Sequence, residues 1–212
     1  MDISDYRREY MSEGLNREAL DNDPFKQFET WFQQADKSGV KDSNAFSLAT
    51  ANERGAPSIR TVLLKSFDFD GFVFFTNYTS RKSTQISENP MAGMLFPWLS
   101  INRQIIVEGS CEKISKSDSL KYFLTRPRGS QLGAWCSDQS SIVESRMFLE
   151  QKYQEASDRF KSGSVPLPPE WGGYRIIPSR IEFWQGRENR LHDRFQYIKN
   201  KKDVWSVERL AP

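Results

Sequence analysis

Segments with the two-residue periodicity of β-strands lie near both ends of this chain, and this distribution restricts the fold more than any other feature. The segments are 45–51, 59–65, 72–76, 91–98, 104–114, 174–177, 180–185, 191–197 and 204–209. Short, turn-rich connections such as 52–57 favour antiparallel hairpins. Because one sheet must accept strands from both ends of the chain, the pattern predicts a mainly β, α+β fold. We expect an antiparallel barrel of about six to eight strands with peripheral helices.

Helices are expected between these strands. Asp23 followed by Pro24 is a helix-start signal, and the apolar residues after it repeat at helical spacing up to Gly39. Further helices are predicted at 80–87, 117–125, 131–136 and 142–161. The sequence before residue 23 is charged and weakly periodic. We therefore expect residues 1–22 to form an arm, with a short helix at 6–10, and residues 23–212 to form a single domain.

The charge balance excludes several classes of function. The chain has 30 basic and 28 acidic residues, a net charge of +2, whereas a nucleic-acid-binding face requires a large basic excess. Any cationic site is therefore local and suits a small anion. The sequence has no apolar run of membrane-spanning length and no secretory signal, and its two cysteines are too few for a disulfide framework. We expect a cytoplasmic protein that binds neither nucleic acid nor membrane.

The segment 181–194 contains His192, the only histidine of the chain, together with three arginines. Polar and apolar residues alternate in 181–185 and again in 190–194, which predicts two strands joined by a tight connection. In this interpretation Arg190, His192 and Arg194 lie on one face of the second strand. Three potentially cationic side chains on one face would attract an anion. A solvated edge strand is the alternative.

Two pairs of basic residues in the first half of the chain are candidate anion ligands. Arg81 and Lys82 begin a predicted helix, where exposed backbone N–H groups favour a phosphate. Cations in the first helical turn oppose the helix dipole, and a bound anion would compensate them. An ordinary capped surface helix is the alternative. Arg60 and Lys65 flank a strand and by its parity point to opposite faces, so they would serve two different anions unless a bulge intervenes.

A third cluster, Tyr122, Arg126 and Ser130, lies around a helix end. Tyr122 and Arg126 are one helical turn apart and share a face, so the cluster could hold one phosphate, although a polar helix end fits equally well. Residues 139–141 add neutral hydrogen-bonding groups. The sequence has no Walker loop, no G-x-G-x-x-G, no zinc-ligand set and no G-x-S-x-G. The residues alone predict one or two small phosphorylated ligands beside one imidazole, and no metal.

The order of these motifs resembles the pyridoxine/pyridoxamine 5′-phosphate oxidase family. The resemblance is most specific in 182–186 and 190–194. Further matches follow in order along nearly the whole chain, at 7–10, 60–65, 75–77, 80–82, 103–104, 122–128, 130–134, 139–141, 171–173 and 209–212. Any one of these short motifs would be weak alone, whereas their shared order makes a chance match negligible.

The resemblance implies a split β-barrel homodimer that binds FMN between its subunits. The implied FMN ligands, some of them from the partner subunit, are Arg60, Phe75, Thr76, Arg81, Lys82, Gln104, Gln139, Ser140, Trp184 and Arg194. The implied substrate ligands are Arg7, Tyr10, Lys65, Tyr122, Arg126, Ser130, Arg190 and His192. Arg190 and His192 would lie against the substrate ring as the catalytic pair, and Arg7 and Tyr10 would belong to a lid. Position 75 is Phe in this chain. Any contact that the family makes there through a tyrosine hydroxyl would therefore be lost or made by the backbone.

The implied activity is oxidation of pyridoxine 5′-phosphate and pyridoxamine 5′-phosphate to pyridoxal 5′-phosphate. A hydride would leave C4′ of the substrate for flavin N5, and O2 would reoxidise the flavin to give H2O2, with ammonia released from the amine. One alternative is a non-catalytic flavin or pyridoxal-phosphate binding protein on the same barrel. Another is a different split-barrel flavoenzyme, such as a reductase that uses another reductant, which should lack the pair Arg190 and His192.

Overall fold

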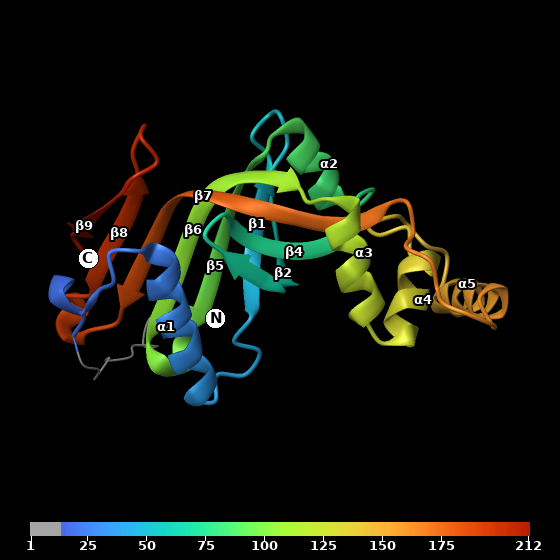
Figure 1. The fold of residues 1–212 in the computed structure, drawn as a ribbon, viewed down its shortest axis with the longest axis horizontal. Helices are drawn as coiled ribbons and strands as arrows, with labels where there is room; N and C mark the ends of the chain where they lie inside the picture. The colour runs from blue at the N-terminus through green and yellow to red at the C-terminus, as the bar shows by residue number, and fades with distance from the viewer. Residues whose placement is uncertain (1–13) are drawn as a thin grey trace, which may run out of the picture.

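A single antiparallel sheet of nine strands organises residues 14–212, the part of the chain that the computed structural model describes. The strand order is β2-β1-β5-β6-β7-β4-β3, and β8 and β9 continue the sheet from β7 (Figure 1). Helices lie around this sheet, so the predicted mainly β fold with peripheral helices is confirmed. Residues 1–13 lie outside the described residues, and with them the helix expected at 6–10 and the expected lid residues Arg7 and Tyr10.

The strands are β1 (Ala45–Ala51), β2 (Pro57–Leu63), β3 (Ser66–Asp68), β4 (Gly71–Asn77), β5 (Met91–Trp98), β6 (Arg103–Lys113), β7 (Trp171–Gln185), β8 (Asp193–Lys199) and β9 (Trp205–Leu210). The helices are α1 (Pro24–Lys37), α2 (Arg81–Glu88), α3 (Lys116–Thr125), α4 (Arg128–Cys136) and α5 (Arg146–Arg159), with 3-10 turns η1 (Arg17–Ala19), η2 (Leu99–Ile101) and η3 (Glu188–Arg190). These nine strands exceed the six to eight expected for the barrel, and β3, which is too short to produce a periodic pattern, is the one that the sequence did not predict.

Strand β7 connects the two ends of the molecule. It pairs with β4 near its start, with β8 near its end and with β6 along its length (Figure 1). The sequence predicts two strands here, at 174–177 and 180–185, and this is wrong. The chain continues as one strand through Pro178, which has no N–H to donate to a neighbouring strand. The pairing register shifts between Glu108 and Gly109 of β6, and this shift accommodates the proline.

Helix α1 closes the aromatic core of the barrel. The Asp23 side chain accepts a hydrogen bond from the Phe25 N–H and Pro24 occupies the first turn, so the predicted start of the helix is confirmed. Phe28 is fully buried, and its ring lies 4.9 Å from that of Phe72 in an edge-to-face arrangement. Such aromatic pairs are worth about 0.5–1.5 kcal/mol beyond their buried area.

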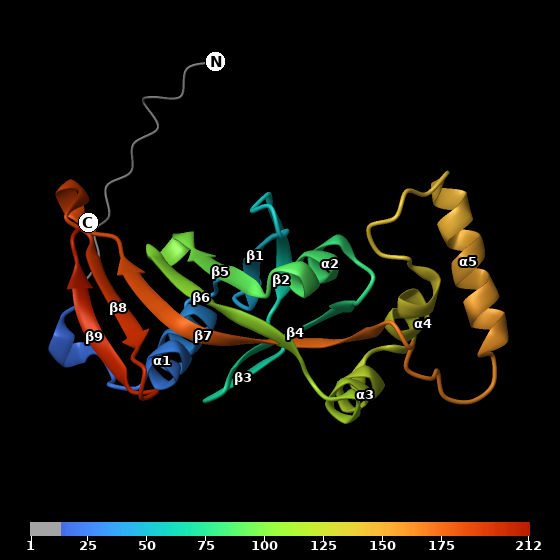
Figure 2. The same ribbon diagram turned by 90° about the horizontal axis from the view of Figure 1, so that it is seen from above.

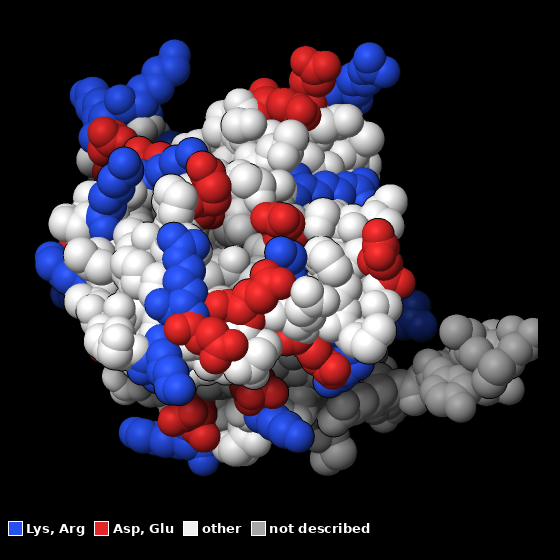
Figure 3. All heavy atoms as spheres, turned by 90° about the vertical axis from the view of Figure 1, so that its right-hand side faces the viewer, with Lys and Arg blue, Asp and Glu red and all other residues white. Residues whose placement is uncertain are grey.

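Helices α3, α4 and α5 gather at the end of the molecule opposite β8 and β9 (Figure 2). The sequence predicts a long amphipathic helix at 142–161, but α5 is shorter and Ala156 is its one buried residue. Several apolar side chains of this region are exposed, namely Ile142, Val143, Met147, Phe148 and Leu149. Figure 3 looks onto this end of the molecule, where basic and acidic side chains are intermixed. None of the helices within residues 14–212 is long and apolar enough to cross a bilayer.

Candidate functional site

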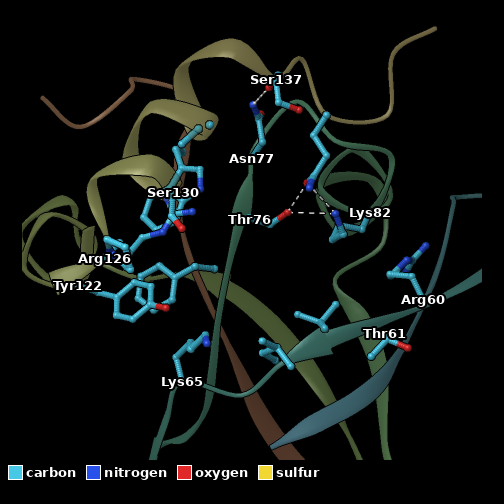
Figure 4. A pocket seen from close by; sticks show the side chains of 18 residues that line it. Arg60, Thr61, Lys65, Thr76, Asn77, Lys82, Tyr122, Arg126, Ser130 and Ser137 are labelled. Atoms are coloured by element: carbon cyan, nitrogen blue, oxygen red, sulfur yellow. Dashed lines mark hydrogen bonds between the residues drawn. The ribbon is translucent and has the colours of Figure 1, made fainter. Parts of the chain in front are cut away.

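A cavity of about 750 Å³ brings together side chains that the sequence placed in three separate clusters (Figure 4). Its walls come from β2, β4, α2, α3, α4, the segment after α4 and the start of β7. Four basic residues line it: Arg60, Lys65, Lys82 and Arg126. The predicted convergence of Tyr122, Arg126 and Ser130 is found, and Phe75, Thr76 and Gln139 line the same cavity.

Lys82 provides the most buried positive charge of the cavity. Its side-chain Nζ donates hydrogen bonds to Thr76 Oγ1 at 3.0 Å, Ser80 Oγ at 3.2 Å and Gln139 Oε1 at 2.9 Å. Burial, and secondarily the charge of Arg60, lower the pKa of Lys82 to about 8. An anion bound here would stabilise the ammonium form and raise this pKa again, so the environment of Lys82 suits a phosphate.

Arg60 lies across the cavity from Lys65 (Figure 4). Its Nη1 donates to the Leu48 carbonyl oxygen at 3.0 Å and to Thr50 Oγ1 at 2.8 Å, which fixes the direction of the guanidinium. Burial, followed by the charge of Arg81, lowers the pKa of Arg60. The prediction that Arg60 and Lys65 point to opposite faces is wrong, because β2 ends before residue 65 and both side chains line the cavity.

The other side of the cavity has an aromatic wall and a buried donor without a partner. The Tyr122 ring stacks on Phe75 at 4.0 Å, and the Arg126 guanidinium lies 4.7 Å from the Trp171 ring. Arg126 Nη1 is buried and makes no hydrogen bond, although buried polar atoms are nearly always paired. Lys65 points toward the same side of the cavity (Figure 4). An anionic oxygen placed between these side chains would satisfy the Arg126 donor.

Two of the expected ligands, Arg81 and Ser140, do not line this cavity. The Arg81 N–H donates to Ser140 Oγ at 3.2 Å, so the start of α2 holds the segment that follows α4. Ser80 stands at the N-cap of α2 as expected, but its side chain makes no capping hydrogen bond. Its Oγ instead accepts from Lys82 and lies 3.1 Å from Ser83 Oγ.

A second group of expected site residues lies where β6, β7 and β8 run side by side. Trp184 of β7 pairs with Gln104 of β6 and with Arg194 of β8. Both carboxylate oxygens of Glu182 accept hydrogen bonds from Arg194, from Nε at 2.8 Å and from Nη2 at 3.1 Å. These hydrogen bonds raise the pKa of Arg194. Arg194 Nη1 donates to the Ala211 carbonyl oxygen at 2.9 Å. Arginine has five N–H donors, and these three hydrogen bonds use three of those of Arg194. They fix the orientation of the guanidinium, so its other two N–H groups can donate to a further ligand.

His192 and Arg190 do not share a strand face with Arg194, contrary to the prediction. Strand β8 begins only at Asp193, and Arg190 lies in η3 with a left-handed φ of 60°. His192 Nδ1 accepts a hydrogen bond from the Arg187 backbone N–H at 3.0 Å. Because a backbone N–H can only donate, Nδ1 is the acceptor in this arrangement, and Nε2 is the ring nitrogen that can donate a hydrogen bond.

Strand β4, which lines the cavity, and strand β8, which carries Arg194 of the second group, pair with opposite ends of β7 (Figure 1). Thr76 of the cavity pairs with Gly172, whereas Gln104 and Arg194 pair with Trp184. The 12 residues from Gly172 to Trp184 span up to about 40 Å in an extended strand. Within residues 14–212 of one chain, the two halves of the expected site therefore do not meet.

Sequence reasoning missed two residues that shape these groups. Trp171 forms a wall of the cavity, and Glu182 orients Arg194. The signal for Glu182 is an acidic residue between two apolar residues of a strand, Ile181 and Phe183, since a buried carboxylate requires a partner. No local signal distinguishes Trp171 from a core residue.

Comparisons with known proteins identify the family of this chain. A family described as pyridoxamine 5′-phosphate oxidase matches residues 32–160, and one described as the pyridoxine 5′-phosphate oxidase C-terminal dimerisation region matches residues 171–212. Proteins named pyridoxine/pyridoxamine 5′-phosphate oxidase from Rippkaea orientalis and Aliarcobacter butzleri are 57% and 56% identical over 212 residues, which is 100% of this chain and of each relative.

Solved structures confirm the expected split-barrel fold. PhzG from Burkholderia lata, solved in complex with tetrahydrophenazine-1-carboxylic acid, superposes with a TM-score of 0.88 and 29% identity. The match covers 93% of this chain and 98% of that chain. A pyridoxamine 5′-phosphate oxidase-related, FMN-binding protein from Nostoc punctiforme has a TM-score of 0.71 at 18% identity, over 89% of this chain and 98% of that one.

Proposed function

This chain belongs to the pyridoxamine 5′-phosphate oxidase family, and we propose that it is an FMN-dependent oxidase. Its substrates would be pyridoxine 5′-phosphate and pyridoxamine 5′-phosphate, its product pyridoxal 5′-phosphate, and its oxidant O2. The observation that carries this proposal is the cavity with cationic ligands on two sides (Figure 4). Two separate anion sites suit two phosphorylated molecules, a flavin mononucleotide and a vitamin B6 phosphate.

The side chains around Lys82 fit the FMN phosphate. Lys82 and Arg60 supply positive charge, and Thr76 and Gln139 supply hydrogen-bonding groups beside it. Arg81 would add charge from the start of α2, and the backbone N–H of Arg81 holds the hydroxyl of Ser140 there. Phe75 lacks a hydroxyl, so its contribution is the face of its ring or its backbone. FMN, when bound, supplies the acceptor for the hydride that leaves C4′ of the substrate.

The side chains around Arg126 fit the substrate phosphate. Arg126 Nη1 is the buried donor without a partner, and Lys65, Tyr122 and Ser130 complete a set of one further cation and two hydroxyls. A dianionic phosphate would pair with both cations and satisfy the buried N–H. The aromatic wall behind Tyr122 would exclude water from this side.

The separation along β7 supports a homodimer with FMN at the interface. The dimer would place Gln104, Trp184 and Arg194 of one protomer beside the cavity of its partner. The exposed apolar residues of α5, and Ile59 and Leu63 on edge strand β2, are suitable interface surface. The C-terminal match to a dimerisation region agrees with this arrangement. The division into an arm, residues 1–22, and one domain, residues 23–212, is part of the same proposal.

Arg190 and His192 would contact the pyridine ring of the substrate. The permanently charged guanidinium of Arg190 would stabilise negative charge that develops in the ring as the hydride leaves. His192, held by the Arg187 N–H, would donate from Nε2 to a polar group of the substrate. While that hydrogen bond persists, Nδ1 is not available to take a proton. Arg7 and Tyr10 would approach the substrate from the N-terminal arm.

One experiment separates this function from a non-catalytic flavin or pyridoxal-phosphate carrier. The purified protein should show the visible spectrum of a flavin. Addition of pyridoxamine 5′-phosphate under air should produce aldehyde, ammonia and H2O2. A yellow protein that forms none of these products would refute the oxidase proposal.

A further inference from the structure

Trp171, the first residue of β7, joins the sheet to the wall of the cavity. Its backbone pairs with Asn77 of β4, and its N–H donates to the Pro168 carbonyl oxygen at 3.2 Å. The residue is only 8% exposed. Its ring stacks on Phe75 at 5.3 Å, and the ring of Tyr122 lies nearly parallel to it, at 6.2 Å. Strand pairing and ring stacking together fix the position of the indole.

The guanidinium of Arg126 lies over aromatic rings. Its Cζ is 4.7 Å from the centroid of the Trp171 ring and 5.7 Å from that of Phe123. Arg126 Nη1 is buried and makes no hydrogen bond. A cation over an aromatic face is attracted by the ring. Within residues 14–212, the rings and not a protein acceptor at Nη1 therefore hold this end of the Arg126 side chain.

The backbone of Arg126 gives its side chain no support from a regular helix. Arg126 is the C-cap residue of α3, with φ −72° and ψ 145°, so the chain turns away from the helix at this residue. Lys82, on the other side of the cavity, is held by hydrogen bonds of its ammonium group instead. Removal of the indole should therefore affect Arg126 and leave Lys82 in place.

We propose that Trp171 is a positioning residue, which holds the Arg126 guanidinium in the orientation that binds the phosphate of the substrate. The inference rests on the part of the proposed function that assigns Arg126 to this phosphate. A guanidinium binds phosphate strongly when its N–H groups point at the oxygen atoms. A long side chain also loses rotamer freedom when it is ordered by a ligand. The indole reduces this loss because it orders Arg126 beforehand.

Loss of the indole should weaken binding of the substrate phosphate. A contact between a guanidinium and an aromatic face corresponds to about a 2- to 30-fold change in affinity. The probe is 4-deoxypyridoxine 5′-phosphate, whose C4′ is a methyl group that carries no hydroxyl or amine to oxidise. For the FMN-loaded protein, Trp171→Leu should raise the Kd of this probe within that range. Trp171→Phe keeps a smaller aromatic face and should raise it less.

The kinetic constants should divide in the same way. KM for pyridoxamine 5′-phosphate should rise with the Kd of the probe, while kcat stays within about twofold, because the phosphate contact is the same in the substrate and in the transition state. FMN affinity should also stay within about twofold in Trp171→Leu. A loss of FMN affinity would overturn the proposal, since the effect would then not be confined to the substrate phosphate.

Trp135→Leu is the matched control. Trp135 packs against the same small hydrophobic cluster as Trp171, and its ring lies 5.1 Å from the Arg159 guanidinium, but it does not line the cavity. This variant should leave the Kd of the probe unchanged. A rise as large as that of Trp171→Leu would overturn the proposal, because general loosening of the cluster would then explain both variants.

A double-mutant cycle tests whether Trp171 acts through Arg126. In the Arg126→Ala background, Trp171→Leu should change the Kd of the probe by less than about twofold. An equal effect in both backgrounds would overturn the positioning role. Trp171→Met fills more of the space without an aromatic face, and it takes the place of Trp171→Leu in every comparison if the leucine variant does not fold.

The binding measurements also separate this inference from the proposed oxidase activity. Absence of turnover in the unmodified holoprotein would refute the oxidase, while the Kd values of the probe would still decide the role of Trp171. Failure of the unmodified holoprotein to bind the probe would overturn both.

Discussion

Flavin binding should depend on pH through Lys82. Burial lowers the pKa of this side chain from 10.5 to about 8, and at 1.36 kcal/mol per pKa unit the ammonium form costs about 3 kcal/mol relative to water. A bound phosphate would recover part of this cost and raise the pKa again. In the apoprotein, the positive charge of Lys82 should therefore be nearly complete at pH 7 and be lost as the pH rises through 8.

The size of the effect follows from the same value. At pH 9 only about one tenth of a group with a pKa of 8 is protonated, so FMN affinity should fall about tenfold between pH 7 and pH 9, or about 1.4 kcal/mol. Titration of the apoprotein with FMN, followed by quenching of flavin fluorescence, measures this directly. Phosphate ionisation near pH 6 does not interfere in this range.

Two substitutions identify Lys82 as the group that titrates. Lys82→Met should weaken FMN binding roughly 10- to 100-fold, the value of a charge-assisted hydrogen bond, and should abolish the decline above pH 8. Lys82→Arg keeps its charge at all these pH values and should also lose the decline. A constant FMN affinity between pH 7 and pH 9 in the unmodified protein would refute the reasoning, and so would an unchanged decline in Lys82→Met.

Substitutions at three further positions test the assignment of ligands. Arg190→Ala should lower kcat more than tenfold while FMN affinity stays within about twofold. Loss of flavin in this variant would show that Arg190 contacts FMN and not the substrate. Arg126→Ala should raise KM for pyridoxamine 5′-phosphate about 10- to 100-fold and leave KM for unphosphorylated pyridoxamine unchanged; equal effects on both would argue against a phosphate contact. His192→Gln, whose amide N–H can replace Nε2–H, should retain more kcat/KM than His192→Asn, and the reverse order would contradict the donor role.

Local sequence signals determined much of the secondary structure. The predicted boundaries of β1 and β5 agree with the structure, and α1 starts where the signal at Asp23 and Pro24 places it. These features depend on side chains within a few residues of one another, through strand alternation and capping. The clusters of basic residues were visible for the same reason. The ordered motifs were sufficient to indicate the family, which the comparisons confirm.

Only the tertiary structure decided how these clusters combine. Lys82 and Arg126 line one cavity because β4 and the helices after β6 meet at one end of β7. His192 and Arg194 lie at the other end and on different elements, because β8 begins at residue 193. Sequence periodicity shows which residues share a face of a strand. It shows neither the residue at which the strand begins to pair nor the strand with which it pairs. Those depend on contacts between residues far apart in the chain, such as Leu15 with Asp193, which no local pattern encodes.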